Sequence, residues 1–273
     1  MSKPAQQPSR LSDQYTLKVK TGAGWKRFFA VRLMISVGSP KHEGEKFRAT
    51  IDWINRNAWN EAEQTGIKKV IVSVNGVLQR HNFVTDCADG VALAQAMKME
   101  QQWIATHRQV VKKINPAIDV RTIQWMEYIG DKDYVGFRNE IDAAYINIPQ
   151  FAETVNADAQ EFLGRQINRL AEEIKVAGGE EKASPELLAR RQRLLDNKPK
   201  LITAGVEYIL EELAAFAMMV EKDPAAEIYP GSNLRSAEFW IKNKPENAPE
   251  RVSRLMGTER CFTRVDFSSI NPT

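Results

Sequence analysis

The stretch VRLMISVGS, residues 31–39, decides how the rest of the chain is interpreted. Its β-favouring run Val31–Val37 is followed by Gly38, which is typical of a short strand that ends in a turn. Further along, apolar residues are spaced as on one face of a helix, at Phe47, Ile51, Ile54 and Ala58. Lys69–Val74, with the sequence KVIVSV, then predicts a second strand that is buried on both faces.

The same alternation continues beyond the second strand. A helical stretch covers Asp89–Ile114, and a strand-like stretch covers Ile118–Ile129. Alternating strands and helices favour a parallel sheet flanked by helices, so the predicted fold class is α/β. At about 100–200 residues per domain, we expect a disordered tail over residues 1–14 and a single domain over residues 15–273.

The rest of the chain is predicted to be mostly helical. We expect a helical region broken near Pro149 over Asp131–Leu170, helices over Pro185–Asp196, Leu201–Glu221 and Asn233–Asn243, and short strands over Tyr15–Lys20, Ala226–Tyr229 and Phe262–Phe267.

The charge of the chain is nearly balanced, but the basic residues are clustered. The formal net charge is +3, with 27% charged and 43% hydrophobic residues, which fits a globular protein. Residues 1–32 hold seven basic residues and one acidic residue, and Arg190–Lys200 holds five and one. Such clusters favour a polyanionic partner, although solvated helix faces and a flexible tail explain them equally well.

Several classes of protein are excluded or disfavoured by what the chain lacks. Two cysteines and three scattered histidines form no metal-binding spacing, so we predict no metal site. No apolar run approaches the ~20 residues that span a bilayer, and we expect a soluble cytoplasmic protein. There is no phosphate-binding GxxxxGK[ST] loop, no GxGxxG, no GxSxG and no HIGH-like or KMSKS-like motif, so we predict no nucleotide cofactor.

Three elements carry chemistry. Ser36 stands at the predicted carboxyl end of the first buried strand, where open parallel sheets bind ligands, and Gly38 lets a ligand approach the backbone. Tyr208 and Glu212 are four residues apart on a predicted helix and share a face, whereas Glu211 is expected to point elsewhere. The third element is Tyr229, which precedes Pro230. Each element alone has an ordinary structural explanation, such as a serine that satisfies a backbone group.

Together, these elements resemble the tRNA-dependent cyclodipeptide synthases. The serine after the first strand, the Tyr-x-x-x-Glu sequence and the later tyrosine occur in the same order and at similar spacing. The region around Ser36 is similar to the XYP subfamily. The sister subfamily NYH has asparagine and histidine where this chain has Ser39 and Pro230. The resemblance extends from about Leu17 to Phe267.

The resemblance implies a monomer with a Rossmann-type domain, similar to the catalytic domain of the class I synthetases for Tyr and Trp but without ATP binding. Such enzymes use two aminoacyl-tRNAs in sequence and make a cyclic dipeptide by a ping-pong mechanism, through aminoacyl and dipeptidyl esters of the serine. Ser36 is then the nucleophile, Tyr208 and Glu212 hold the amine, and Tyr229 relays a proton in the ring closure. Gly38, Ser39 and Pro230 support these residues.

The resemblance also implies binding surfaces. The residues that correspond to a basic tRNA-binding helix are Lys98, Arg108, Lys112 and Lys113, and a second plausible contact consists of Arg190, Arg191 and Arg193. The pocket for the first aminoacyl group is expected at Arg32, Met34 and Glu227. Two other functions stay open: a non-catalytic module that binds aminoacyl-tRNA, and another acyltransferase or hydrolase on the same scaffold.

Overall fold

The computed structural model describes residues 17–21, 24–28, 30–39, 42–62, 66–84, 87–228, 234–243 and 245–257. The predicted tail over residues 1–14 and the predicted strand Phe262–Phe267 lie outside these ranges.

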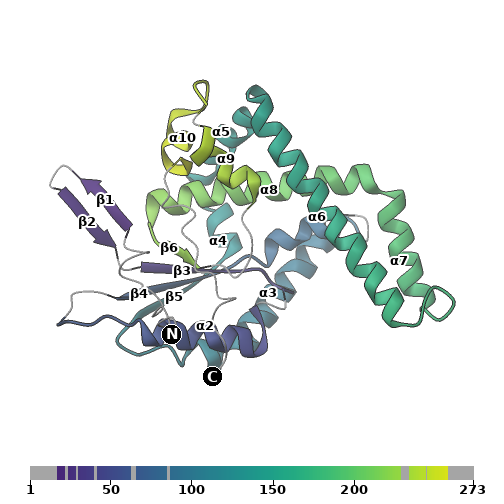
Figure 1. The fold of residues 1–273 in the computed structure, drawn as a ribbon, viewed down its shortest axis with the longest axis horizontal. Coiled ribbons are helices and arrows are strands. Elements are labelled where there is room, and N and C mark those ends of the chain that lie inside the picture. Colours follow the sequence, from purple (N-terminus) through teal and green to yellow (C-terminus); the bar gives the residue numbers. More distant parts are fainter. Residues whose placement is uncertain are drawn as a thin grey trace, which may run out of the picture.

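A parallel sheet of four strands forms the centre of the molecule (Figure 1). Its strands are β3 (Ala30–Ile35), β4 (Lys69–Val74), β5 (Asp119–Gln124) and β6 (Ala226–Ile228), in the order β5-β4-β3-β6. All three pairings are parallel. The predicted α/β class with a parallel sheet is therefore confirmed.

Helices cover both faces of the sheet, as Figure 1 shows. Helices α2 (Gly44–Arg56) and α3 (Asp89–Val111) contribute to one core, which includes Leu33 of β3. Met34, the next residue, belongs to the core on the opposite face. This alternation follows from the extended backbone, since successive side chains of a strand point to opposite faces.

The opposite face is covered by most of the later helices. They are η2 (Val77–Asn82), α4 (Trp125–Ile129), α5 (Tyr134–Asn147), α6 (Pro149–Val176), α8 (Lys198–Lys222), α9 (Arg235–Asn243) and α10 (Glu250–Met256). Helix α7 (Pro185–Asp196) packs against α6 and α8 in a separate apolar cluster. Helices α6 and α7 extend away from the sheet as a hairpin (Figure 1). In the described ranges, no helix is long and apolar enough to cross a membrane.

Two predictions about local structure were incomplete. The stretch Ile118–Ile129 is not one strand, because it changes into helix α4 after Gln124. At this point the carboxylate of Glu127 accepts a hydrogen bond from the backbone N–H of Gln124 at 2.8 Å, as in the capping box that stabilises the start of a helix. Near the N-terminus, β1 (Leu17–Thr21) pairs with an unpredicted antiparallel strand, β2 (Gly24–Phe28).

Candidate active site

The carboxyl end of β3 lies where the order of the strands reverses. From β3 the chain continues to β4 on one side and returns much later to β6 on the other side. Ligands of open parallel sheets bind outside the strand ends at such a switch point. Ser36, the residue after β3, therefore occupies the expected position for contact with a ligand, and it is half-buried.

The N–H and the carbonyl oxygen of Ser36 both have hydrogen-bonding partners. Its carbonyl oxygen accepts from the N–H of Ser39 at 3.1 Å, which closes a turn through Gly38. Gly38 is exposed and has a φ of 82°, a conformation that favours glycine. The N–H of Ser36 donates to Nδ1 of His42 at 2.9 Å. Nδ1 of His42 also lies 3.2 Å from the carbonyl oxygen of Ser36.

His42 is held in turn by helix α3. The indole N–H of Trp103 donates to the carbonyl oxygen of His42 at 3.3 Å. His107 stacks on Trp103 and lies 2.9 Å from a carboxylate oxygen of Glu43. The contact between Ser36 and His42 could not be predicted from the sequence, because a backbone N–H carries no sequence signal.

Tyr208 and Glu212 lie one turn apart on α8, and both are half-buried. The ring of Tyr208 contacts those of Phe162 and His81, with centroid distances of 5.5 and 6.3 Å. His81 belongs to η2, which follows the carboxyl end of β4 and packs against α8. Because β4 pairs with β3, the Tyr208 segment of α8 lies at the same edge of the sheet as Ser36.

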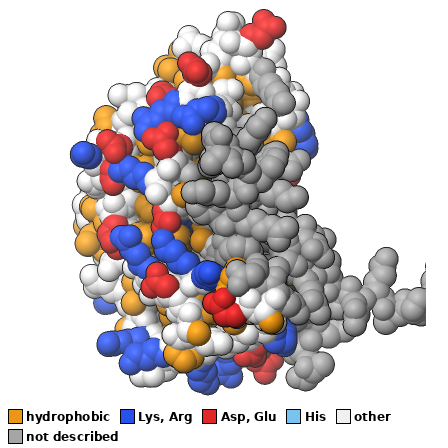
Figure 2. Space-filling model, turned by 90° about the vertical axis from the view of Figure 1, so that its left-hand side faces the viewer, with side chains coloured by type: hydrophobic (Ala, Val, Ile, Leu, Met, Phe, Trp, Pro, Cys, Tyr) orange, Lys and Arg blue, Asp and Glu red, His pale blue; other side chains and the backbone are white. Residues whose placement is uncertain are grey.

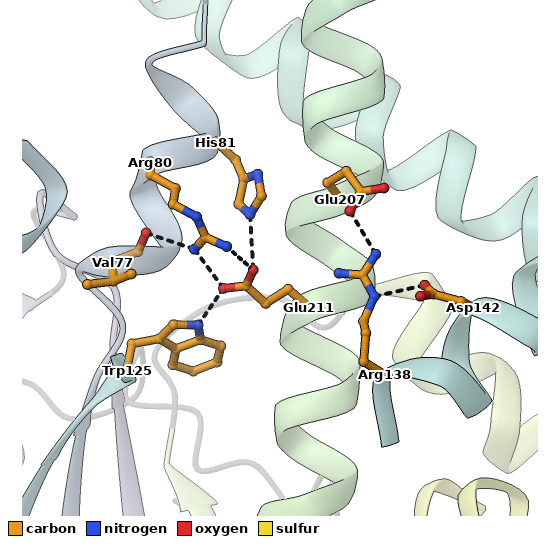
Figure 3. Close-up of polar contacts among 8 residues, drawn as sticks. All are labelled: Val77, Arg80, His81, Trp125, Arg138, Asp142, Glu207 and Glu211. Atoms are coloured by element: carbon orange, nitrogen blue, oxygen red, sulfur yellow. Dashed lines mark hydrogen bonds and ion pairs between the residues drawn. The ribbon is translucent and has the colours of Figure 1, made fainter. Parts of the chain in front are cut away.

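Glu211, between these two positions, points into a buried cluster of polar groups (Figure 3). Its carboxylate accepts two hydrogen bonds from the guanidinium of Arg80, one of them at 2.8 Å. It also accepts from the indole N–H of Trp125 at 2.7 Å and lies 3.2 Å from Nε2 of His81. One side chain thereby joins α8 to η2 and to the start of α4.

The surroundings of Glu211 keep it charged. Burial by itself would raise the pKa of this carboxyl group, but the hydrogen bonds from His81 and Arg80 lower the pKa to about 2. Beside this cluster, the guanidinium of Arg138 bonds Glu207 of α8 at 2.7 Å and Asp142 of α5 at 2.8 Å (Figure 3). Helix α8 is therefore fixed by charged groups on two sides.

A second buried carboxylate organises the ends of β4 and β5. One oxygen of Glu100 accepts from the backbone N–H of Gly76 at 3.2 Å and of Trp125 at 3.1 Å. Burial is the main reason that the pKa of Glu100 is raised. Gly76 allows this approach, since a Cβ there would lie 2.3 Å from the Cβ of Glu100.

The three predicted pocket residues are buried at the β3–β6 boundary. Arg32 and Glu227 are neighbours in the sheet register, as the expected ion pair requires, and Met34 is 2% exposed. The guanidinium of Arg32 also donates to the carbonyl oxygen of Asp223 at 2.8 Å. The hydroxyl of Tyr128 also lies beside Arg32, because it forms hydrogen bonds with the side chains of Arg32 and Ser73.

The predicted tRNA-binding residues lie on the surface. Lys98, Arg108, Lys112, Lys113, Arg190 and Arg193 are exposed. Arg191 is half-buried and forms an ion pair with Glu180 at 2.6 Å. Figure 2 shows the left-hand side of Figure 1, where Lys and Arg side chains are mixed with Asp and Glu; helix α7 lies on the opposite side.

Two predicted site residues, Tyr229 and Pro230, lie outside the described ranges. Within those ranges, no group of three or more His, Cys, Asp or Glu side chains is arranged to hold a metal ion.

No protein-family model matches the chain, and no curated protein matches its sequence significantly. Solved structures do match it. A CDPS from Fluoribacter dumoffii has a TM-score of 0.62 and 17% identity, with 89% of this chain and 90% of that chain covered. The cyclodipeptide synthase from Candidatus Glomeribacter gigasporarum, bound to Phe-tRNAPhe, has a TM-score of 0.59 and 20% identity, over 81% and 84%.

A Mycobacterium tuberculosis protein has a TM-score of 0.53 and 12% identity, over 81% of both chains. Its structure relates cyclodipeptide synthetases to type I tRNA synthetases. The chain therefore has the fold that these cyclodipeptide synthases share with the class I tRNA synthetases.

Proposed function

We propose that this chain is a cyclodipeptide synthase of the XYP type, which joins the amino acids of two aminoacyl-tRNAs into a cyclic dipeptide. The observation that carries the proposal is the position of Ser36, held by its backbone at the switch point of a fold found in cyclodipeptide synthases. The proposed family membership implies a cytoplasmic monomer, since aminoacyl-tRNA is a cytoplasmic substrate.

The first step forms an ester on Ser36. The hydroxyl oxygen of Ser36 attacks the carbonyl carbon of an aminoacyl-tRNA, and the bond from that carbon to the ribose oxygen breaks. The proton of the serine hydroxyl ends on the departing ribose oxygen. Tyr208 and Glu212 hold the amine of the transferred residue, the phenol by a hydrogen bond and the carboxylate by a charge-assisted one.

The second step extends this ester and the third closes the ring. For a dipeptide to remain on Ser36, the amine of the bound residue attacks the ester of the second aminoacyl-tRNA and releases its tRNA. The new terminal amine then attacks the ester of Ser36, which forms the cyclic dipeptide and regenerates the serine hydroxyl. In our proposal Tyr229 carries the proton from amine to serine oxygen, with Pro230 next to it.

The residues around Arg32 suit a small first amino acid. Met34 takes up volume that a smaller residue would leave open, and a paired Arg32 and Glu227 would offer no apolar surface to a large side chain. We therefore propose alanine or a residue of similar size. If Arg32 instead binds substrate, an acidic amino acid is the alternative.

Expression in bacteria, followed by mass spectrometry of the medium, tests this function. We expect a cyclic dipeptide from the native chain and none from Ser36→Ala, while both bind aminoacyl-tRNA. Ser253→Ala, the same chemical change on α10, is the matched control. Product from Ser36→Ala at the native level would overturn the proposal.

Two results identify the alternatives. A binding module would hold aminoacyl-tRNA and leave Ser36 unmodified in intact-protein mass spectra. An acyltransferase or hydrolase of another kind would keep its activity after ribonuclease treatment of the substrate mixture.

A further inference from the structure

Asn75 lies beside Ser36 at the carboxyl edge of the sheet. The register pairs Ile35 with Val74, and the N–H of Asn75 donates to the carbonyl oxygen of Ile35 at 3.0 Å. The ladder therefore continues one step beyond the two strands and places Asn75 next to Ser36, at the strand spacing of about 4.8 Å. Register neighbours point to the same face, which for Asn75 is also the face of Ser73.

The side chain of Asn75 is buried, and its amide oxygen has no hydrogen-bonding partner in the part of the chain that the structure describes. The residue is 2% exposed, and among the described residues its Oδ1 accepts no hydrogen bond. Buried polar groups are almost always paired, because an unpaired one keeps the full penalty for losing water. The nearby N–H of Gly76 is already bonded to Glu100 and is not available to this oxygen.

The chemistry of the proposed substrate offers the missing partner. An aminoacyl group on Ser36 has an ester carbonyl, which only accepts hydrogen bonds, and an amine, which donates them. The amine is separated from the ester carbon only by the α-carbon, so it stays close to the serine. We propose that Oδ1 of Asn75 accepts a hydrogen bond from the amine of the residue esterified to Ser36, an assignment that rests on the proposed function.

A neutral amide suits an amine that has to react. To attack the second aminoacyl-tRNA, the amine must lose its extra proton. A second carboxylate beside the amine would favour the ammonium form and raise the pKa of the amine. An amide oxygen accepts a hydrogen bond from the neutral amine as well as from the ammonium. Asn75 thereby orients the amine for attack, and its contribution belongs to the second step and not to the acylation of Ser36.

The test separates the two steps in Asn75→Leu, which has a similar size and no acceptor. The purified chain is mixed with one aminoacyl-tRNA, and aminoacyl-Ser36 is followed by intact-protein mass spectrometry. A second portion of aminoacyl-tRNA is then added. We expect acylation within about threefold of the native rate and a second step slowed about tenfold, as for a lost hydrogen bond between neutral groups.

Asn75→Asp keeps the size and the acceptor but adds a charge. This variant tests the same inference if the Leu variant does not fold. We again expect normal acylation and a slow second step, because the amine is held as ammonium. A native second step in either folded variant overturns the inference. A loss of acylation equal to the loss in the second step also overturns it and indicates a structural role. If the native chain itself forms no aminoacyl-Ser36, it is the proposed function that fails.

Discussion

Replacing Glu211 by glutamine removes the charge at the centre of the cluster that joins α8 to η2 and α4. The carboxyl group has its pKa lowered from the usual 4.5 to about 2 by His81 and Arg80, although burial opposes this. At 1.36 kcal/mol per pKa unit, that difference corresponds to about 3 kcal/mol of folding free energy at neutral pH. A similar value is expected for a buried ion pair that loses one partner.

The pH dependence of this contribution has a definite sign. Since the pKa is lower in the folded chain, the stabilisation is fully present above pH 4.5 and is lost as the pH falls toward about 2. The free energy of unfolding of the native chain and of Glu211→Gln should therefore differ by about 3 kcal/mol at pH 7 and converge in acid.

Urea unfolding followed by circular dichroism measures both values. Glu212→Gln is the matched control, because it makes the same chemical change at the next position, where the side chain is half-buried. It should cost less stability and remove most of the synthase activity, whereas the folded fraction of Glu211→Gln should keep much of its activity. An effect of Glu211→Gln below ~1 kcal/mol at pH 7, or one that persists at pH 2, would refute the reasoning.

Three other outcomes are expected. His42→Leu removes the acceptor for the N–H of Ser36 and should slow acylation of Ser36 about tenfold. His42→Asn keeps an acceptor near the position of Nδ1 and should slow acylation less. Equal acylation rates in His42→Leu and the native chain would contradict this role of the contact. Charge reversal at Lys98, Arg108 and Lys112 should weaken tRNA binding without changing the product. If ~4–6 phosphates are neutralised in the native complex, the logarithm of the binding constant should fall with the logarithm of the salt concentration with a slope of about −3 to −5. Binding that does not depend on salt contradicts the assignment. Met34→Gly should widen the range of first amino acids, and cyclo(Phe-Phe) or cyclo(Leu-Leu) from the native chain would exclude the small pocket.

The fold was predictable where burial imposes a regular pattern. Lys69–Val74 is apolar on both faces because helices cover both, and its bounds agree with the structure. Pro185–Asp196 was also correct, because Ser184 caps the helix and Pro185 suits its first position. In Ile118–Ile129, by contrast, β-favouring residues continue into α4, and one capping side chain marks where the strand ends.

The site was predictable only where strand topology determines it. The position of Ser36 follows from the end of β3 in a parallel sheet. The partners of Glu211 do not follow from the sequence, since Arg80 and Trp125 are 131 and 86 residues away from it. The roles of His42 and Asn75 depend on contacts with backbone groups of Ser36 and Ile35, and such contacts leave no pattern in the sequence.

The pairing of β6 with β3 has a consequence for synthesis of the chain. Arg32 and Asp223, which meet at this boundary, are 191 residues apart. At about 5–20 residues per second, a ribosome needs ~10–40 s to make the intervening segment. For that time one edge of β3, a strand whose side chains are all buried in the finished fold, has no partner strand. An unpaired apolar edge invites pairing with other chains, so slow translation between β3 and β6 should lower the soluble yield of this protein.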